Sequence, residues 1–229
     1  MDTDVLTGLA ETIADQPRAE GVKAYRSEPA RAHTFWHKGQ VSAERRSVHF
    51  GHAPATIWLT GLSGAGKSTV AYALEKMLHD EGRSSYVLDG DNLRHHLNRD
   101  LGFSPADRKE NIRRTAEVAK MMNEAGLMVI AALISPYRED REMAAAIIGA
   151  EQFIEVYVST PGAVCEARDP KGLYAKARAG EIPAFTGISS PYEVPLLPAL
   201  ALDTGELTLE QATSALYRHL ALRFRTKKK

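Results

Sequence analysis

Nine consecutive residues carry the strongest chemical signal in the chain. Residues 61–69 read Gly-Leu-Ser-Gly-Ala-Gly-Lys-Ser-Thr and fill each fixed position of G-x-x-x-x-G-K-[ST], the phosphate-binding P-loop pattern. In such a loop, glycines let backbone N–H groups turn toward an anion, and the following helix adds its positive dipole end. We expect Lys67 to reach the outer phosphates of a nucleotide and Ser68 to bind Mg²⁺. The predicted nucleotide-binding residues here are Gly61, Leu62, Ser63, Gly64, Ala65, Gly66, Lys67, Ser68 and Thr69.

Two carboxylates follow the next predicted strand. Asp89 and Asp91 stand in the run Leu88-Asp89-Gly90-Asp91-Asn92-Leu93-Arg94. Parallel-sheet proteins gather ligands beyond the carboxyl ends of their strands, so both side chains should lie beside the P-loop. Phosphoryl transfer needs metal ligands and a group that orients or deprotonates the acceptor hydroxyl, and these two carboxylates could divide that work. The alternative is a turn followed by a helix cap.

Further side chains could bind the acceptor molecule. Arg108 and Asn111 are three residues apart, so they share a helix face, and with Arg94 they could form a cationic clamp for an anion. An exposed charged face is the alternative. Phe103 and Phe185 stand in polar surroundings and could stack on a planar base, with core packing as the alternative.

The elements that must position these residues alternate along the chain. Strands are predicted at 55–60, 84–89, 127–134, 153–159 and 199–203, and helices at 67–81, 91–98, 105–125, 138–149, 161–168 and 207–223. This alternation predicts an α/β fold with a mainly parallel five-stranded sheet covered on both faces, the three-layer P-loop NTPase-type architecture.

Two segments do not follow this alternation of strands and helices. Residues 170–192 are long and mixed in composition, with prolines and glycines, and we expect them to form a lid segment. Residues 1–50 are predicted to form an N-terminal extension or arm, with a short amphipathic helix over 3–15 and loosely packed chain over 16–50. The P-loop domain is then predicted to span 51–229.

Composition narrows the class of protein further. The 229 residues are 44% hydrophobic and 25% charged, and 29 basic residues balance 29 acidic ones, so we expect neither a nucleic-acid nor a membrane partner. Cys165 is the single cysteine, which suits a reducing, cytoplasmic location and a buried apolar role. The N-terminus does not resemble a signal peptide.

Together these blocks resemble the adenylylsulfate kinase (APS kinase) family, from about Thr34 to the C-terminus. Besides the P-loop and the 88–94 run, the matching blocks are Leu101-Gly102-Phe103-Ser104, Asp107-Arg108-Lys109-Glu110-Asn111-Ile112-Arg113-Arg114, Ile134-Ser135-Pro136-Tyr137-Arg138, residues 165–174 and Phe185-Thr186-Gly187-Ile188. The resemblance implies transfer of the γ-phosphate of ATP, with Mg²⁺, to the 3′-hydroxyl of adenosine 5′-phosphosulfate, giving PAPS and ADP in sulfate assimilation. The family often has an acidic residue where Ser189 stands here.

The resemblance also implies a role for each site residue. The catalytic set is Lys67, Asp89, Asp91, Ser135 and Lys171, with Ser68 and Asp89 as metal ligands and Arg168 as a contact to the base of ATP. The implied adenylylsulfate-binding residues are Asp91, Arg94, Phe103, Arg108, Asn111, Ile134, Ser135, Lys171 and Phe185. Ser135 matches a serine described in the family as a phosphoserine intermediate. In-line transfer needs no covalent relay, so we expect Ser135 not to act as one.

Two rival functions share parts of this pattern. A P-loop kinase for another small alcohol would keep the phosphate machinery without the two-phenylalanine, two-arginine acceptor site. A nucleotide-sensing module docked on an ATP sulfurylase would need no catalysis, and intact Lys67, Ser68, Asp89 and Asp91 argue against it. A GTPase is disfavoured because the chain has no Asn-Lys-x-Asp run. We also expect a homodimer and consider an association with an ATP sulfurylase.

Overall fold

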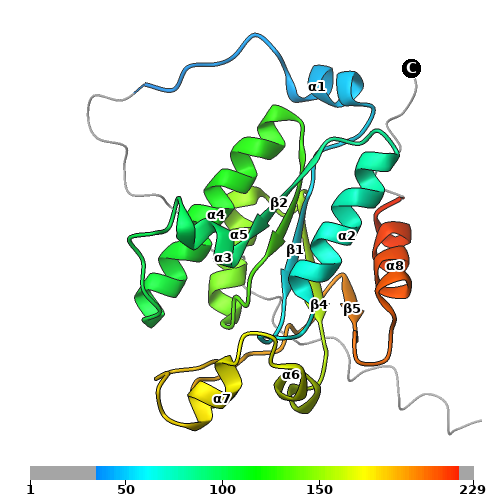
Figure 1. Cartoon of the computed structure of the whole chain (residues 1–229). Helices are drawn as coiled ribbons and strands as arrows, with labels where there is room; N and C mark the ends of the chain where they lie inside the picture. The colour runs from blue at the N-terminus through cyan, green and yellow to red at the C-terminus, as the bar shows by residue number, and fades with distance from the viewer. Residues whose placement is uncertain (1–34, 222–229) are drawn as a thin grey trace, which may run out of the picture. The chain divides into compact units, whose positions relative to one another are not determined.

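A five-stranded parallel sheet lies between two layers of helices in the computed structural model, which describes residues 35–221 (Figure 1). The strands run in the order β2-β3-β1-β4-β5, with bounds Thr56–Thr60 for β1, Ser85–Asp89 for β2, Met128–Ala132 for β3, Phe153–Val158 for β4 and Leu200–Leu202 for β5. Each neighbouring pair is parallel. The predicted α/β three-layer architecture is therefore confirmed.

Alternate residues of the central strand feed two separate hydrophobic cores. Ile57 and Leu59 pack with the cluster under α2 (Lys67–Asp80) and α8 (Leu209–Ala221). Trp58 packs with the cluster under α4 (Pro105–Ala125) and α5 (Arg138–Ile148). A strand buried on both faces reads as a continuous apolar run, which is why Thr56–Thr60 has no polar alternation.

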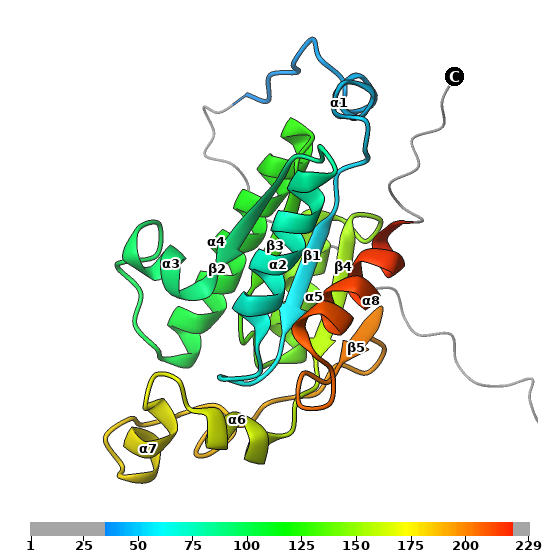
Figure 2. The ribbon, with the colours of Figure 1, turned by 45° about the vertical axis from the view of Figure 1, so that its right-hand side comes forward.

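The helices that carry site residues begin at the carboxyl ends of the strands. The short helix α3 spans Gly90–His95 directly after β2. Helix α4 begins at Pro105, as predicted, and Ser104 is its N-cap. Two further short helices, α6 (Gly162–Arg168) and α7 (Leu173–Arg178), lie beyond the carboxyl ends of the strands (Figures 1 and 2). The site therefore forms at the strand ends, between these helices and the sheet.

Two short helices were not predicted. Within 16–50, where an extended arm or loosely packed extension was expected, residues Ala43–Phe50 form α1, which Ser42 caps through its hydroxyl and Gly51 ends at φ 70°. Phe50 packs against Gly126, where an added Cβ would lie 2.7 Å from the ring. Helix α7 lies inside the predicted lid segment. The predicted helix over 3–15 lies outside the described residues, and the predicted domain boundary after residue 50 stays a prediction.

Candidate active site

The loop between β1 and α2 has the backbone geometry of an anion cradle. Gly61 and Gly64 have φ of 149° and 74°, and an added Cβ would lie 2.5 Å from the Val158 carbonyl oxygen and 2.8 Å from that of Cys165. Gly66, at φ 92°, is the N-cap of α2. These contacts explain the glycines, because a side chain would collide with neighbouring backbone before the loop could close.

Lys67 is almost entirely buried at the start of α2. Its ammonium donates hydrogen bonds to the carbonyl oxygens of Gly61, at 3.0 Å, and Leu62, at 2.7 Å. Burial lowers the pKa of Lys67 to about 8, because a desolvated ammonium is disfavoured. The lysine therefore lies across its own loop, beside the backbone groups that would contact a phosphate.

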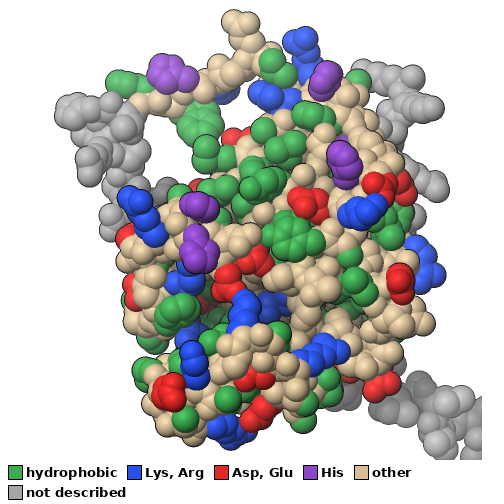
Figure 3. All heavy atoms as spheres, viewed as in Figure 1, with side chains coloured by type: hydrophobic (Ala, Val, Ile, Leu, Met, Phe, Trp, Pro, Cys, Tyr) green, Lys and Arg blue, Asp and Glu red, His purple; other side chains and the backbone are tan. Residues whose placement is uncertain are grey.

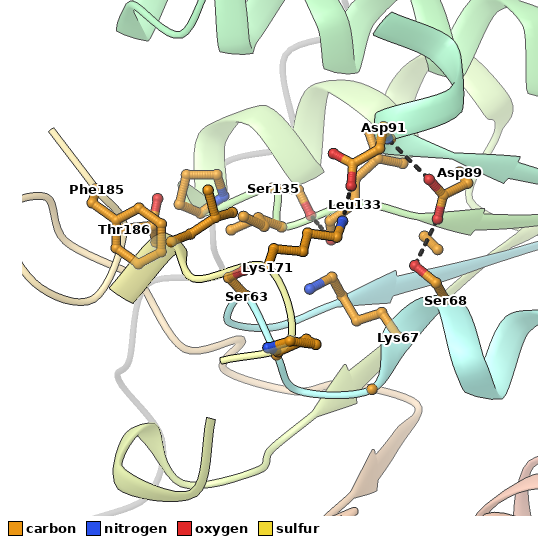
Figure 4. A pocket seen from close by; sticks show the side chains of 18 of the residues that line it. Ser63, Lys67, Ser68, Asp89, Asp91, Leu133, Ser135, Lys171, Phe185 and Thr186 are labelled. Carbon is orange, nitrogen blue, oxygen red and sulfur yellow. Dashed lines mark hydrogen bonds and ion pairs between the residues drawn. The ribbon is translucent and has the colours of Figure 1, made fainter. Parts of the chain in front are cut away.

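Asp89 joins the P-loop to α3 through its two carboxylate oxygens. Its Oδ2 accepts a hydrogen bond from the Ser68 hydroxyl at 2.6 Å (Figure 4). Its Oδ1 accepts from the backbone N–H groups of Asp91, at 2.9 Å, and Asn92, at 3.3 Å. The cap that the sequence offered as an alternative is therefore present, and it fixes the carboxylate so that its other oxygen faces Ser68.

Asp91 points away from this cap toward the lid segment. Its carboxylate forms an ion pair with the ammonium of Lys171, from the turn between α6 and α7. Both side chains are more than half exposed, so the pair can separate at little cost in free energy. Figure 4 shows the ammonium groups of Lys67 and Lys171 turned toward the same space in front of the two aspartates.

One pocket of about 1210 Å³ collects most of the residues predicted from sequence. Gly61, Leu62 and Ala65 are absent from its lining. The predicted residues that line it are Ser63, Gly64, Gly66, Lys67, Ser68, Thr69, Asp89, Asp91, Arg94, Phe103, Arg108, Asn111, Ile134, Ser135, Arg168, Lys171 and Phe185. Segments more than 100 residues apart in the chain thus meet in one cavity at the strand ends.

The two phenylalanines have different surroundings within this pocket. The Phe103 side chain is 66% exposed, and the Arg94 guanidinium carbon lies 4.4 Å from its ring centroid. Phe185 is 7% exposed and meets Tyr174 edge to face, with ring centroids 5.0 Å apart. Phe185 is therefore packed partly into the core while it lines the pocket, whereas the ring of Phe103 is exposed.

The two arginines are held by backbone oxygens of one short stretch of chain, residues 101–103. Arg94 donates from Nη1 to the carbonyls of Leu101, at 3.2 Å, and Gly102, at 2.7 Å. Arg108 donates from Nε to the Phe103 carbonyl at 2.8 Å. Burial lowers the pKa of both guanidinium groups, and for Arg94 the neighbouring Arg108 lowers it further. A bound anion would offset both effects, because it favours the charged form.

Arg108 also reaches across to the lid segment. Its Nη1 donates to the Thr186 hydroxyl and its Nη2 to the Ala184 carbonyl, each at 2.7 Å. These two acceptors flank Phe185 in the chain, and the third partner of Arg108 is the carbonyl of Phe103. One guanidinium group thus connects the backbone segments that carry both phenylalanines.

The Ser135 hydroxyl accepts a hydrogen bond at the rim of the apolar core. Trp58 donates its indole N–H to Ser135 Oγ at 3.1 Å, and the serine is 3% exposed. Its backbone adopts φ 39°, and its carbonyl accepts from Arg141 at 2.7 Å. The carbonyl of Ile134 accepts from the Thr60 hydroxyl at 2.7 Å. The Ile134–Ser135 turn is therefore fixed by several long-range hydrogen bonds.

Thr204 is a pocket residue that the sequence reasoning missed. Its hydroxyl accepts from Arg168 Nη1 at 2.8 Å and donates to the Ala65 carbonyl at 2.9 Å, and its own carbonyl accepts from Arg168 Nη2 at 2.5 Å. It therefore ties Arg168 to the P-loop. The available signal was its place directly after the last predicted strand, in the run Asp203-Thr204-Gly205.

A P-loop on a parallel sheet, with two carboxylates at the next strand end, defines a P-loop kinase. The family model described as adenylylsulphate kinase matches residues 53–203. The chain belongs to the adenylylsulphate kinase family.

Individual relatives agree with this assignment. The chain is 55% identical over 188 residues to an adenylyl-sulfate kinase of Staphylococcus epidermidis, which covers 82% of this chain and 94% of the relative. It is 61% identical over 172 residues to an adenylyl-sulfate kinase of Escherichia coli O139:H28, and this match covers 75% of this chain and 86% of the relative. The structure of the Mycobacterium tuberculosis APS kinase in complex with AMPPNP and APS matches with a TM-score of 0.72 and 49% identity, covering 74% of this chain and 99% of that one.

Proposed function

We propose that the chain is an adenylylsulfate kinase that transfers the γ-phosphate of ATP to the 3′-hydroxyl of adenosine 5′-phosphosulfate (APS), giving PAPS and ADP. The observation that carries this proposal is the shared pocket. P-loop residues line it together with the arginine and phenylalanine side chains. A cavity with phosphate-binding groups at one end and groups for a nucleotide-like anion at the other suits in-line transfer between two nucleotides.

ATP is bound by the P-loop end of the pocket. Its phosphates lie on the backbone N–H groups of residues 61–69, with the Lys67 ammonium at the outer phosphates. Arg168 contacts the base, and Thr204 holds its guanidinium group in place. Transfer is favoured because fixed positive charge meets the charge that spreads over the transferred phosphoryl group.

The Ser68–Asp89 pair fits Mg²⁺. Both donors are hard oxygen atoms, which Mg²⁺ prefers, and they lie 2.6 Å apart at the edge of the phosphate loop. Mg²⁺ commonly takes its other ligands from substrate phosphates and water, so two protein oxygen atoms suffice to propose this site. When bound, Mg²⁺ neutralises charge on the phosphate oxygens and holds them in position.

Asp91 is the carboxylate that orients and deprotonates the acceptor hydroxyl. Both oxygens of Asp89 are used, by Ser68 and by the α3 cap, whereas Asp91 forms an ion pair with the exposed side chain of Lys171. Lys171 can then leave Asp91 and contact the transferred phosphate, because a lysine has three rotatable donors and a flexible stem. Asp89 thus holds the metal ion, and Asp91 activates the acceptor hydroxyl; the sequence alone did not say which aspartate has which role.

The acceptor end of the pocket binds APS by charge and by stacking. Arg94, Arg108 and Asn111 contact the phosphosulfate, and Phe103 stacks on the adenine with Phe185 on the opposite side. The Ile134–Ser135 backbone reads the edge of the same base. Ser135 acts through its position and not as a phosphoryl carrier, because in-line transfer to a bound hydroxyl needs no covalent relay.

Three expectations about the surroundings of the enzyme stay predictions. We predict a homodimer, which light scattering after gel filtration would measure, and an association with an ATP sulfurylase, which co-purification would detect. A cytoplasmic location is predicted from the single cysteine, Cys165.

No helix within residues 35–221 is long and apolar enough to cross a bilayer. On the face drawn in Figure 3, acidic and basic side chains are intermixed.

ADP formation by the purified chain tests this function. With ATP and Mg²⁺, we expect ADP to form rapidly after APS is added, and slowly with a panel of sugars, nucleosides and other neutral alcohols. Rapid ADP formation with a neutral alcohol, and none with APS, would instead identify a kinase for another small alcohol. Nucleotide binding without any turnover would identify a sensing module.

A further inference from the structure

A buried asparagine lies behind the acceptor end of the pocket. Asn98, in the turn after α3, is 0% exposed and donates its Nδ2 to the Oδ1 of Asn111, on α4, at 2.9 Å. Asn98 is not among the residues that line the pocket, whereas Asn111 is. The contact between the two amides therefore joins the protein interior to the acceptor site.

The oxygen of the Asn98 amide indicates that Asn98 does not serve the stability of the fold. Its Oδ1 is buried and has no hydrogen-bond partner among the described residues. An unsatisfied buried carbonyl oxygen costs stability, and an apolar side chain of similar size would avoid that cost. Asn123, a buried asparagine on α4, shows the contrast, since its Oδ1 accepts from Thr56 and its Nδ2 donates to the Leu127 carbonyl.

The Asn98 contact decides which part of the Asn111 amide faces the pocket. An asparagine amide presents an acceptor on one side and two donors on the other, and the two sides are nearly equal in shape. Because Asn98 donates to the Asn111 oxygen, the remaining group of Asn111 is its NH₂ donor. The same end of the pocket carries the guanidinium groups of Arg94 and Arg108.

We propose that Asn98 is a positioning residue that holds the Asn111 amide with its NH₂ group toward the anionic part of the acceptor. Without Asn98, the amide can rotate and present its carbonyl oxygen, which repels an anion. The phosphosulfate would then lose a donor and gain an opposing dipole, while the ATP end would be unchanged. This inference rests on the proposed function, because it takes APS as the anion.

The test measures APS and ATP dissociation constants and the melting temperature in Asn98→Leu. We expect APS affinity to fall about tenfold, the size of one lost charge-assisted hydrogen bond, with ATP affinity unchanged. The melting temperature should stay close to that of the wild type, because leucine removes the unsatisfied Asn98 oxygen but also leaves the Asn111 amide without its partner. Asn123→Leu is the matched control, and it should lower the melting temperature without changing APS affinity.

A double-mutant cycle shows whether Asn98 acts through Asn111. In the Asn111→Ala background, Asn98→Leu should leave APS affinity unchanged, since the amide to be oriented is gone. Asn98→Asp should weaken APS binding more than Asn98→Leu, because a carboxylate accepts from the Asn111 NH₂ and turns the carbonyl toward the acceptor.

Several results would overturn this proposal. They are a misfolded Asn98→Leu variant, unchanged APS affinity, an equal loss of ATP affinity, or a loss that persists in the Asn111→Ala background. If the wild type itself does not bind APS, the proposed function fails first, and that outcome is distinct from each of these.

Discussion

Arg108 donates a 2.7 Å hydrogen bond to the hydroxyl of Thr186, across 78 residues of sequence. Thr186 is 2% exposed, and the bond is partly buried at the wall of the pocket. The same guanidinium group bonds the carbonyls of Ala184 and Phe103. Arg108 therefore does two things in this account: it supplies positive charge to the acceptor site, and it sets the positions of the segments that carry Phe103 and Phe185.

Removal of the Thr186 hydroxyl should separate these two functions. In Thr186→Val, we expect APS affinity to fall about tenfold, because one hydrogen bond to a charged group is lost. ATP affinity should be unchanged, since its phosphates are bound by the P-loop. Isothermal titration of each ligand measures this. Thr186→Ser keeps the hydroxyl and is the control, and a loss of APS affinity in Thr186→Ser as large as in Thr186→Val would show that the hydroxyl is not responsible.

Stacking at the acceptor site should depend on the aromatic face of Phe103. Phe103→Leu should weaken APS binding by about 1–3 kcal/mol, while Phe103→Tyr should weaken it much less. The side chain is 66% exposed, so neither change should disturb folding. Separate dissociation constants for APS and ATP test this. An equal effect of leucine and tyrosine, or a parallel loss of ATP affinity, would contradict a stacking role.

The parallel sheet covered on both faces follows from features that the sequence displays directly. Apolar strands such as 55–60 alternate with helices of ten or more residues, and that spacing is enough to predict a parallel three-layer fold. The helix α1 was missed because none of its residues is buried, so it shows no apolar period. The helix α7 was missed because it lies inside a segment rich in glycine and proline. Local caps and packing on neighbouring elements stabilise them instead.

The site was predictable where function depends on residue type within a short run, as in residues 61–69. It was not predictable where a residue acts through a distant partner. Nothing near Arg108 in the sequence indicates Ala184 or Thr186, and nothing near Arg168 indicates Thr204. Those pairs depend on how the lid segment and the loop after β5 fold over the strand ends.

Binding of ATP should take up a proton near pH 8. Burial lowers the pKa of Lys67 to about 8, so the unliganded protein holds this lysine partly deprotonated at that pH. Bound phosphates favour the ammonium and raise its pKa, so the complex binds more protons and ATP affinity should fall as pH rises above 8.

Calorimetry in two buffers with different ionisation enthalpies measures this proton uptake. Lys67→Arg is the control, because an arginine stays charged at this pH. Proton uptake of equal size in Lys67→Arg would mean that another group titrates.

The lid segment, residues 170–192, should become resistant to protease when both ligands are bound. Closure must exclude water, since water competes with the acceptor hydroxyl for the phosphoryl group. Limited proteolysis with and without a non-hydrolysable ATP analogue plus APS, followed by mass spectrometry of the fragments, measures the change. Equal cleavage within 170–192 in both states would contradict a lid.

Ser135→Ala should retain substantial activity. The Ser135 hydroxyl accepts the indole N–H of Trp58 at 3.1 Å, so its loss leaves a buried donor without a partner and should lower stability by about 1–3 kcal/mol. Chemical denaturation and initial rates measure the two effects separately. Rapid, stoichiometric transfer of label from ATP to Ser135, and from there to APS, would show that the serine is a phosphoryl carrier after all.

The identity of the phosphorylated product tests the central claim most directly. The purified chain would be incubated with Mg²⁺, APS and ATP, and the products followed by ³¹P NMR, with Lys67→Ala as the catalytic control. The account predicts a new phosphate monoester on the 3′-oxygen of APS in amounts equal to the ADP formed, and almost none of it with Lys67→Ala. ADP release without this 3′-phosphate, or phosphorylation of APS that Lys67→Ala supports equally well, would contradict it.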